Sequence, residues 1–295
     1  MNYLSFSDFL IRRFGGKTLK VAVDAGFSCP NRENGRNGCA WCDNDAFSAA
    51  VRGNGRLPVA EQVRRGLARL RARHPRVTRF LAYFQAYTNT FAPAARLREL
   101  YTEALNADPQ IVGLAIGTRP DCVDAEKIAL LEELARRTFI QVEYGLQSIN
   151  DATLAAMHRG HTVADFSRAM ALSRGRGLYL CAHLIVGLPG DTLDDSVRAA
   201  EFLGAERIDG VKIHNLHIVR DTPLAERYAR APFPLPTLGE YARTAARVIR
   251  ALPPTVSIQR LAAAPRDPAQ LVAPAWCLRA GDVARAVETE LARLA

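Results

Sequence analysis

The residues best suited to chemistry are three cysteines that lie close together near the start of the chain, Cys29, Cys39 and Cys42. Three thiolates on one Gly- and Asn-rich loop can hold a metal centre and leave one coordination position without a protein ligand. A structural zinc site closes with four protein ligands, whereas a catalytic zinc keeps one position open. A four-iron cluster held by three cysteines leaves one iron for another ligand. The spacing alone therefore leaves zinc and an iron–sulfur cluster open as alternatives.

The cysteine content favours a metal over disulfide bonds. Six cysteines in 295 residues are too few for a disulfide scaffold. The other three, Cys122, Cys181 and Cys277, are scattered, and we expect them to be buried as small apolar side chains. No apolar run approaches the ~20 residues of a membrane helix. The N-terminus also has the wrong order of charged and apolar residues for a secretory signal, so we expect a cytoplasmic protein with no membrane partner.

The basic charge of the chain allows two interpretations. A net charge of +9 and a pI near 9.6 are typical of proteins that bind a polyanion such as RNA. However, 35 of the 39 basic residues are arginine, and this bias can also come from base composition. The arginine-rich stretch at 64–79 is accordingly either the solvated face of a helix or a surface that faces RNA.

Short β-rich runs alternate with longer amphipathic stretches along the chain. The predicted strands are 18–23, 80–84, 111–116, 140–144, 178–186 and 210–218, and the predicted helices are about 58–73, 93–107, 124–137, 162–175 and 191–204. Thr162 with Asp165 and Thr192 with Asp195 have the spacing of capping boxes at two helix starts. Strict alternation predicts a parallel sheet with right-handed crossovers.

The unusual motifs all fall just after predicted strands. They are the cysteines, Gln85, residues 117–120, Gln147 with Ser148, and residues 187–190. In a (β/α) barrel such positions converge on one mouth, whereas an open sheet uses only those near one switch point. We therefore predict an α/β fold with a partial (β/α)6 TIM-type barrel, formed with an N-terminal segment by residues 1–230. Residues 231–295 contain a proline-rich link, two helices and one strand, and we expect a small α/β extension packed on the barrel.

The segment from Cys181 to Thr192 joins an apolar strand to a glycine-flanked turn and a capped helix. Together with the cysteine loop it resembles the radical S-adenosylmethionine (radical SAM) enzymes. The long Cys-x9-Cys-x2-Cys spacing is similar to the branch that contains the Elongator catalytic subunit and the YhcC-like proteins. Further similar motifs occur in the same order at 84–90, 116–121, 143–148, 159–161 and 271–276.

The resemblance implies two cofactors and a type of reaction. Cys29, Cys39 and Cys42 would bind three irons of a [4Fe-4S] cluster, and SAM would bind the fourth. An electron from an external donor would then cleave SAM, and the resulting 5′-deoxyadenosyl radical would act on a substrate that the sequence does not identify. The basic charge and the Elongator resemblance favour an RNA-linked substrate.

The resemblance and the residue types also suggest contacts to SAM. Trp41 matches a position where family members place an aromatic near the adenine. The amides of Gln85 and Gln147 suit a zwitterion or ribose hydroxyls, and an arginine fork suits a carboxylate. The remaining candidates are Thr118, Arg119, Glu143, Ser148, Arg159 and Gly187. For each arginine the alternative is a structural ion pair, and for Glu143 it is pairing with one of those arginines.

Two features separate this chain from typical family members. The Gly-Gly-Glu element common after the second strand is absent, and Gln85 could substitute for its contact to the SAM amino group. Residues 261–264 are apolar where YhcC-like relatives carry more polar residues.

His161, His183, His214 and His217 lie near the predicted mouth, either as substrate or proton-transfer groups or as ordinary core residues. A non-catalytic iron–sulfur or zinc scaffold and a hydrolytic zinc barrel are the alternative functions.

Overall fold

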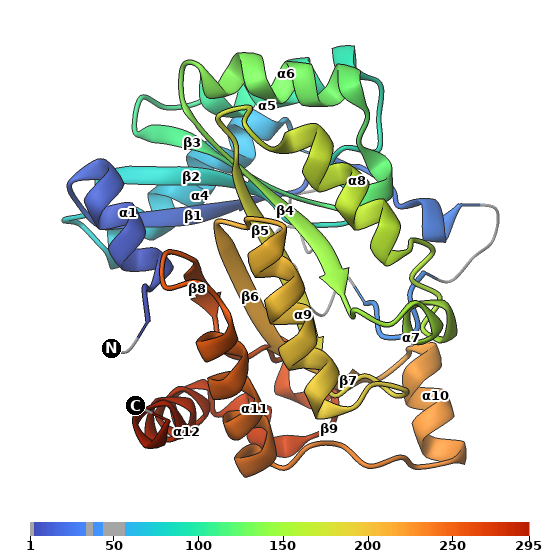
Figure 1. Cartoon of the computed structure of the whole chain (residues 1–295). Helices are drawn as coiled ribbons and strands as arrows, with labels where there is room; N and C mark the ends of the chain where they lie inside the picture. The colour runs from blue at the N-terminus through green and yellow to red at the C-terminus, as the bar shows by residue number, and fades with distance from the viewer. Residues whose placement is uncertain (1–2, 34–37, 44–56, 295) are drawn as a thin grey trace.

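The centre of the molecule is a curled, entirely parallel sheet of seven strands. A computed structural model describes residues 3–33, 38–43 and 57–294, so the Asn- and Gly-rich insert at 34–37 lies outside the described residues. The sheet order is β1-β2-β3-β4-β5-β6-β8 (Figure 1). The strands are β1 Thr18–Val23, β2 Arg79–Phe84, β3 Ile111–Thr118, β4 Phe139–Gln147, β5 Tyr179–Val186, β6 Gly210–Asn215 and β8 Ser257–Arg260. The predicted partial barrel is confirmed, and its sheet has one strand more than the six predicted units supply.

Amphipathic helices cover the outer face of this sheet (Figure 1). They are α4 Val59–Arg73, α5 Ala94–Leu105, α6 Ala125–Ala135, α8 Val163–Ser173 and α9 Leu193–Ala205, each close to a predicted range. Their apolar faces and the outward-facing strand residues form one core, in which the rings of Phe84 and Tyr101 lie 5.1 Å apart. Both predicted capping boxes are present, at Thr162 and Thr192. These caps satisfy free backbone N–H groups and fix where α8 and α9 begin.

The N-terminal helix α1, Phe6–Phe14, was not predicted. Ser5 caps it by accepting a hydrogen bond from the backbone N–H of Asp8. Its apolar side chains pack against residues at the amino ends of the strands, among them Phe139 and Tyr179. The helix therefore covers the end of the barrel opposite to the cysteines, so access to the interior is from the carboxyl ends of the strands.

Other unpredicted elements lie around the mouth. They are α7 Asp151–Ala156, α10 Pro223–Arg230, and the strands β7 Ile218–Val219 and β9 Leu271–Ala273, which pair antiparallel. Four short 3-10 helices add turns at Pro30–Arg32, Pro120–Cys122, Pro268–Gln270 and Ala275–Leu278. The strand predicted at 210–218 ends at Asn215, because the chain turns there to form β7 instead of extending the barrel strand.

The C-terminal segment is built into the sheet. Strand β8 pairs parallel with β6, while the helices α11 Leu238–Ala251 and α12 Ala280–Arg293 pack on the same core. The division of the chain at residue 230 stays a prediction. Cys122, Cys181 and Cys277 are buried, as expected. Of the helices in the described ranges, none has the length and apolar character needed to span a bilayer.

Helix α4 lies so close to β1 that Gly66 has no room for a side chain. A Cβ at this position would overlap Cγ1 of the buried Val21. We expect Gly66→Ala to destabilise the protein by about 1–2 kcal/mol, because overpacking outweighs the better helix propensity of alanine. Urea denaturation measures this change. Val21→Ala should cost less in the Gly66→Ala background than in the wild type, and additive effects of the two substitutions would contradict this contact.

Candidate functional site

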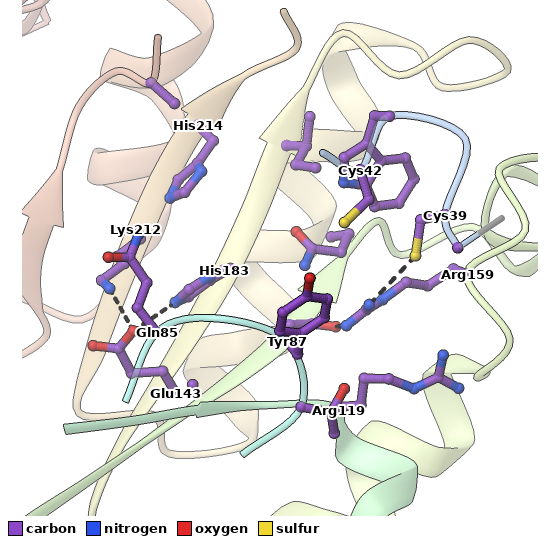
Figure 2. Close-up of a pocket in the computed structure, with 18 of the residues that line it drawn as sticks. Cys39, Cys42, Gln85, Tyr87, Arg119, Glu143, Arg159, His183, Lys212 and His214 are labelled. Carbon is purple, nitrogen blue, oxygen red and sulfur yellow. Dashed lines mark hydrogen bonds and ion pairs between the residues drawn. The ribbon is translucent and has the colours of Figure 1, made fainter. Parts of the chain in front are cut away.

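One cavity of about 240 Å³ opens at the carboxyl ends of the strands, and it brings most of the predicted site residues together (Figure 2). Ten of the twelve line it: Cys29, Cys39, Trp41, Cys42, Gln85, Thr118, Arg119, Glu143, Gln147 and Arg159. Parallel strands end at a common edge, so residues distant in sequence meet here. The walls also contain Gly117 and Gly145, where the backbone itself faces the cavity.

The two predicted residues outside this lining have local structural partners. The Ser148 hydroxyl accepts a hydrogen bond from the backbone N–H of Asn150 at 2.9 Å, at the start of α7. Gly187 has φ of +94°, and a Cβ there would lie 2.9 Å from Cδ of Pro236 in the proline-rich link. Positive φ favours glycine, so this residue lets the link pass close to the end of β5. The cofactor contacts of both residues stay predictions.

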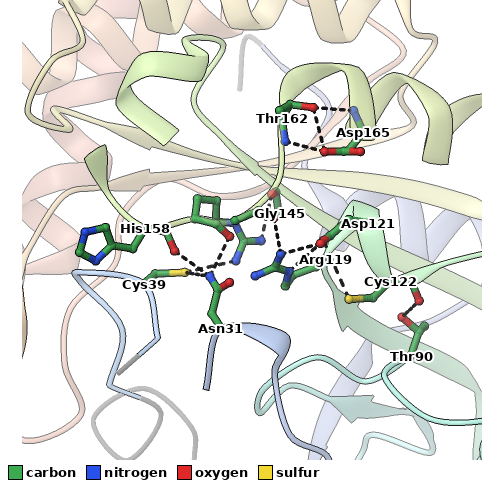
Figure 3. Close-up of polar contacts among 12 residues, drawn as sticks. Asn31, Cys39, Thr90, Arg119, Asp121, Cys122, Gly145, His158, Thr162 and Asp165 are labelled. Carbon is green, nitrogen blue, oxygen red and sulfur yellow. Dashed lines mark hydrogen bonds and ion pairs between the residues drawn. The ribbon is translucent and has the colours of Figure 1, made fainter. Parts of the chain in front are cut away.

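The sulfur side of the cavity is equipped with hydrogen-bond donors. The Cys39 Sγ accepts from Asn31 Nδ2 at 3.3 Å and from Arg159 Nη1 at 3.6 Å (Figures 2 and 3). The same Asn31 amide lies 2.7 Å from the carbonyl oxygens of His158 and Arg159, which fixes its orientation. Burial and the neighbouring Cys39 raise the pKa of the Cys42 thiol to about 11. Donors that face a sulfur stabilise a thiolate, whereas burial disfavours the thiolate of Cys42 until a metal centre binds it.

The ligand requirements of a single metal ion and of a four-iron cluster differ. Among residues 3–33, 38–43 and 57–294, no three His, Cys, Asp or Glu side chains are grouped so that they could hold one metal ion. Zinc requires its sulfur ligands at about 2.3 Å from one ion. In a four-iron cluster each cysteine binds a different iron, so the sulfurs need not converge on one point. Three cysteines that line one cavity are compatible with such a cluster.

Arg119 and Arg159, predicted to pair with a carboxylate of SAM, are mostly occupied by protein groups. The guanidinium of Arg119 pairs with both carboxylate oxygens of Asp121, at 2.8 and 2.6 Å, and donates to the Gly160 carbonyl at 2.8 Å (Figure 3). Arg159 donates to the Gly145 carbonyl at 3.1 Å as well as to Cys39. Within the described residues, Nη1 of Arg119 and Nε of Arg159 are buried without a partner. Each arginine thus combines a structural role with one free donor beside the cavity.

Glu143 is not paired with an arginine, so that interpretation was wrong. Its side chain is fully buried in the barrel interior, and five side chains surround its carboxylate. They are Lys20 at 2.8 Å, Tyr83 at 2.8 Å, Gln141 at 2.9 Å, His183 at 3.0 Å, and Lys212 in a short ion pair (Figure 2). Burial disfavours the charged form, but the two lysines and the histidine hold the pKa of Glu143 well below its usual value.

Sequence reasoning missed most of this polar cluster. Lys20 and Lys212 are two of only four lysines and lie in the middle of apolar strands. Since lysine is almost never fully buried without a partner, this placement was an available signal. His183 was noted as a candidate, and its ring stacks on that of His214 with centroids 5.3 Å apart. Burial and Lys212 lower the pKa of His183 to about 4, and burial with Arg260 lowers that of His214 well below its usual value.

Comparison with known protein families identifies the superfamily of the chain. Residues 29–203 match the model of the radical SAM superfamily, and residues 208–293 match that of the radical SAM C-terminal domain. The chain belongs to the radical SAM superfamily. Members of this superfamily use a [4Fe-4S] cluster and SAM, so the open coordination position beside three cysteines has a natural occupant.

Individual proteins give the same result. The chain is 40% identical to Protein YhcC of Escherichia coli K12 over 275 residues, which cover 92% of this chain and 86% of that protein. It is 26% identical to Elongator complex protein 3 of Schizosaccharomyces pombe over 196 residues, 62% of this chain and 35% of that one. The structure of Methanocaldococcus infernus Elp3 superposes with a TM-score of 0.67 at 21% identity, covering 78% of this chain and 59% of that chain. The predicted resemblance to the YhcC-like and Elongator branch is confirmed, as is the fold.

The hydrogen bond from Asn31 to Cys39 predicts an effect on the cluster potential. Hydrogen bonds to sulfur ligands raise the potential of an iron–sulfur cluster, since they stabilise the more negative reduced form. Asn31→Leu in the reconstituted protein should lower the midpoint potential by about 40 mV, because one net hydrogen bond contributes about 1 kcal/mol and a one-electron couple shifts by 59 mV per tenfold. An EPR-monitored redox titration measures the shift at equal iron and sulfide content. An unchanged potential in a fully loaded variant would contradict the role of Asn31.

The lowered pKa of His183 predicts a pH dependence of stability. The groups facing its ring are Glu143, Lys212, His214 and Arg260. In the unfolded chain His183 binds a proton near pH 6.5, whereas the folded protein binds it only near pH 4. The free energy of unfolding therefore falls by about 2 kcal/mol on account of this residue when the pH is lowered from 7.5 to 5.

His183→Gln should make the loss of stability between these pH values smaller by that amount, as measured by urea denaturation of the metal-free protein. His74→Gln, at an exposed position after α4, is the matched control. Equal slopes for the wild type and His183→Gln would show that this ring already carries its proton in the folded state.

Proposed function

We propose that Cys29, Cys39 and Cys42 bind a [4Fe-4S] cluster and that the chain cleaves SAM reductively for radical chemistry on a substrate. One observation carries the proposal: the three cysteines line a single cavity, together with seven of the nine residues predicted to contact SAM, in a chain of the radical SAM superfamily. When bound, the reduced cluster supplies the electron that splits SAM into methionine and a 5′-deoxyadenosyl radical. An external one-electron donor is required.

The residues around the cysteines have distinct tasks in this proposal. Asn31 and Arg159 orient Cys39 and compensate thiolate charge, as their contacts to Sγ support. Gln85 and Gln147 present amides to the amino acid or ribose part of SAM, and Trp41 offers a ring for the adenine. The covering of the opposite barrel end by α1 keeps water and oxygen from entering there. Arg119 holds its own loop through Asp121 and leaves its Nη1 nitrogen for the ligand.

An RNA-linked substrate in the cytoplasm is a further hypothesis. It rests on the net charge of +9 and on the similarity to Elongator complex protein 3. The arginine-rich helix α4 does not add to it, because Arg64 and Arg65 pair with Glu61, and Arg71 pairs with Asp108. These pairs support the solvated helix face, which was the alternative interpretation of the 64–79 stretch, for the three arginines that form them.

The proposal predicts formation of 5′-deoxyadenosine by the anaerobically reconstituted, dithionite-reduced protein given SAM. The Cys39→Ala/Cys42→Ala variant should produce less than 1% of the wild-type amount (~2 orders of magnitude), because it cannot hold the cluster. Liquid chromatography of the quenched reaction measures the product, with and without added bulk tRNA and with and without a small-molecule cell extract. Absence of product in every mixture, despite full iron and sulfide loading, would refute catalysis and leave the scaffold alternative. Stimulation by tRNA alone would support an RNA-linked substrate.

A further inference from the structure

We propose that the inner half of the cavity binds an anionic group, a carboxylate or a phosphate, at the end of the substrate. The inference names the substrate class of the site proposed above and rests on that proposed function. In Figure 2 the sulfur atoms of Cys39 and Cys42 lie with Arg159 on one side of the cavity. The inner half is the other side, away from the cysteines, where the labelled residues are Gln85, Glu143, His183, Lys212 and His214.

The inner half has an excess of positive charge. Lys20 and Lys212 share one carboxylate, that of Glu143, and of these two lysines Lys212 lines the cavity. Among the described residues that line the cavity, Glu143 is the single acidic side chain. Arg260, at the end of β8, adds a further positive charge to this lining. Lys212 is buried and Arg260 is exposed, so this part of the lining has two cations against one carboxylate, and an anion is the ligand that this excess favours.

Two polar groups of the inner half are without a protein partner. In the part of the chain that the structure describes, the Arg260 guanidinium makes no hydrogen bond or ion pair, although it lies near enough to Tyr83, His183 and His214 to affect their pKa values. The Nε2 atom of His214 is buried and also has no partner. Arg260 and His214 line the same cavity, so the arginine fork can bind the oxygens of a carboxylate or phosphate with the His214 ring beside it.

The shape of the cavity indicates that the anion is terminal. Beneath Lys212, which is 4% exposed, the barrel is filled by the polar cluster around Glu143 and then by the apolar contacts of α1. A chain entering from the mouth therefore ends at this floor and cannot pass through it. This geometry excludes an internal phosphodiester of RNA as the group bound here, whereas a metabolite or a modified residue with one anionic end fits.

The walls between the floor and the mouth are partly apolar. They include Ile185, Leu216, Ala263 and Ala264. A substrate that presents carbon–hydrogen bonds next to its anionic end would match this lining, and hydrogen abstraction needs such bonds held apart from water.

The test is isothermal titration calorimetry of the anaerobically reconstituted holoenzyme with SAM, using inorganic phosphate and acetate as separate probes at constant ionic strength. We expect at least one probe to bind, and Arg260→Gln to weaken its binding at least tenfold, since a hydrogen bond to a charged group contributes about 1.5–3 kcal/mol. His214→Leu should weaken it as well. Arg243→Gln, an exposed arginine of α11 outside the cavity lining, is the matched control and should bind like the wild type.

The outcomes separate this inference from the proposed function. Preference for phosphate or for acetate identifies the anionic group. Binding of neither probe, or equal weakening by Arg260→Gln and Arg243→Gln, would overturn the inference even if 5′-deoxyadenosine is formed. Binding that depends on Arg260 without any 5′-deoxyadenosine would instead leave the anion site standing and refute the radical reaction. Circular dichroism melts of each variant show that lost binding is not lost folding.

Discussion

The buried carboxylate of Glu143 is the constraint on which the barrel interior depends. A carboxylate with no exposed surface is stable only where charges and hydrogen bonds replace water. Its partners come from β1, β2, β5 and β6, and one partner comes from its own strand β4. One side chain thereby ties together five of the seven strands at one level. The positions of Tyr83, His183 and Lys212 relative to each other, and so the floor of the cavity, follow from this single ion cluster.

The same strand connects the floor to the cysteine loop. Two residues after Glu143, Gly145 leaves space that a side chain would fill, because a Cβ there would lie 2.5 Å from Nη2 of Arg159. Arg159 uses that space to reach both the Gly145 carbonyl and the sulfur of Cys39. Strand β4 therefore supports the cavity at both ends, with a charge at the floor and a missing side chain at the mouth. Side-chain alternation along the strand places both residues on the same face.

Local patterns in the sequence were sufficient to predict most of the strands and the end of the barrel at which the site lies. The strand predicted at 18–23 has the observed bounds of β1, and the motifs that follow strands do converge on one mouth. The expectation that residues after a strand face the cavity did not hold for Ser148 and Gly187. Ser148 instead accepts a hydrogen bond in a turn, and Gly187 lies against a proline of the link. The partners of Glu143 were beyond sequence reasoning, since Lys20 lies 123 residues away and no local spacing connects them. Strand β8 was missed as part of the sheet for the same reason, as its partner β6 lies across a proline-rich link.

The number of basic residues is less informative about the substrate than the positions of a few of them. The count of basic residues suggested a polyanion as partner, yet many arginines lie on outer helices in exposed ion pairs such as Arg98 with Glu133. Exposed pairs of this kind contribute little to stability and leave little net field. The informative cations are few, because Lys20 and Lys212 share one fully buried carboxylate, that of Glu143. A small excess of charge in the barrel interior therefore constrains the substrate more strongly than the larger excess on the surface does.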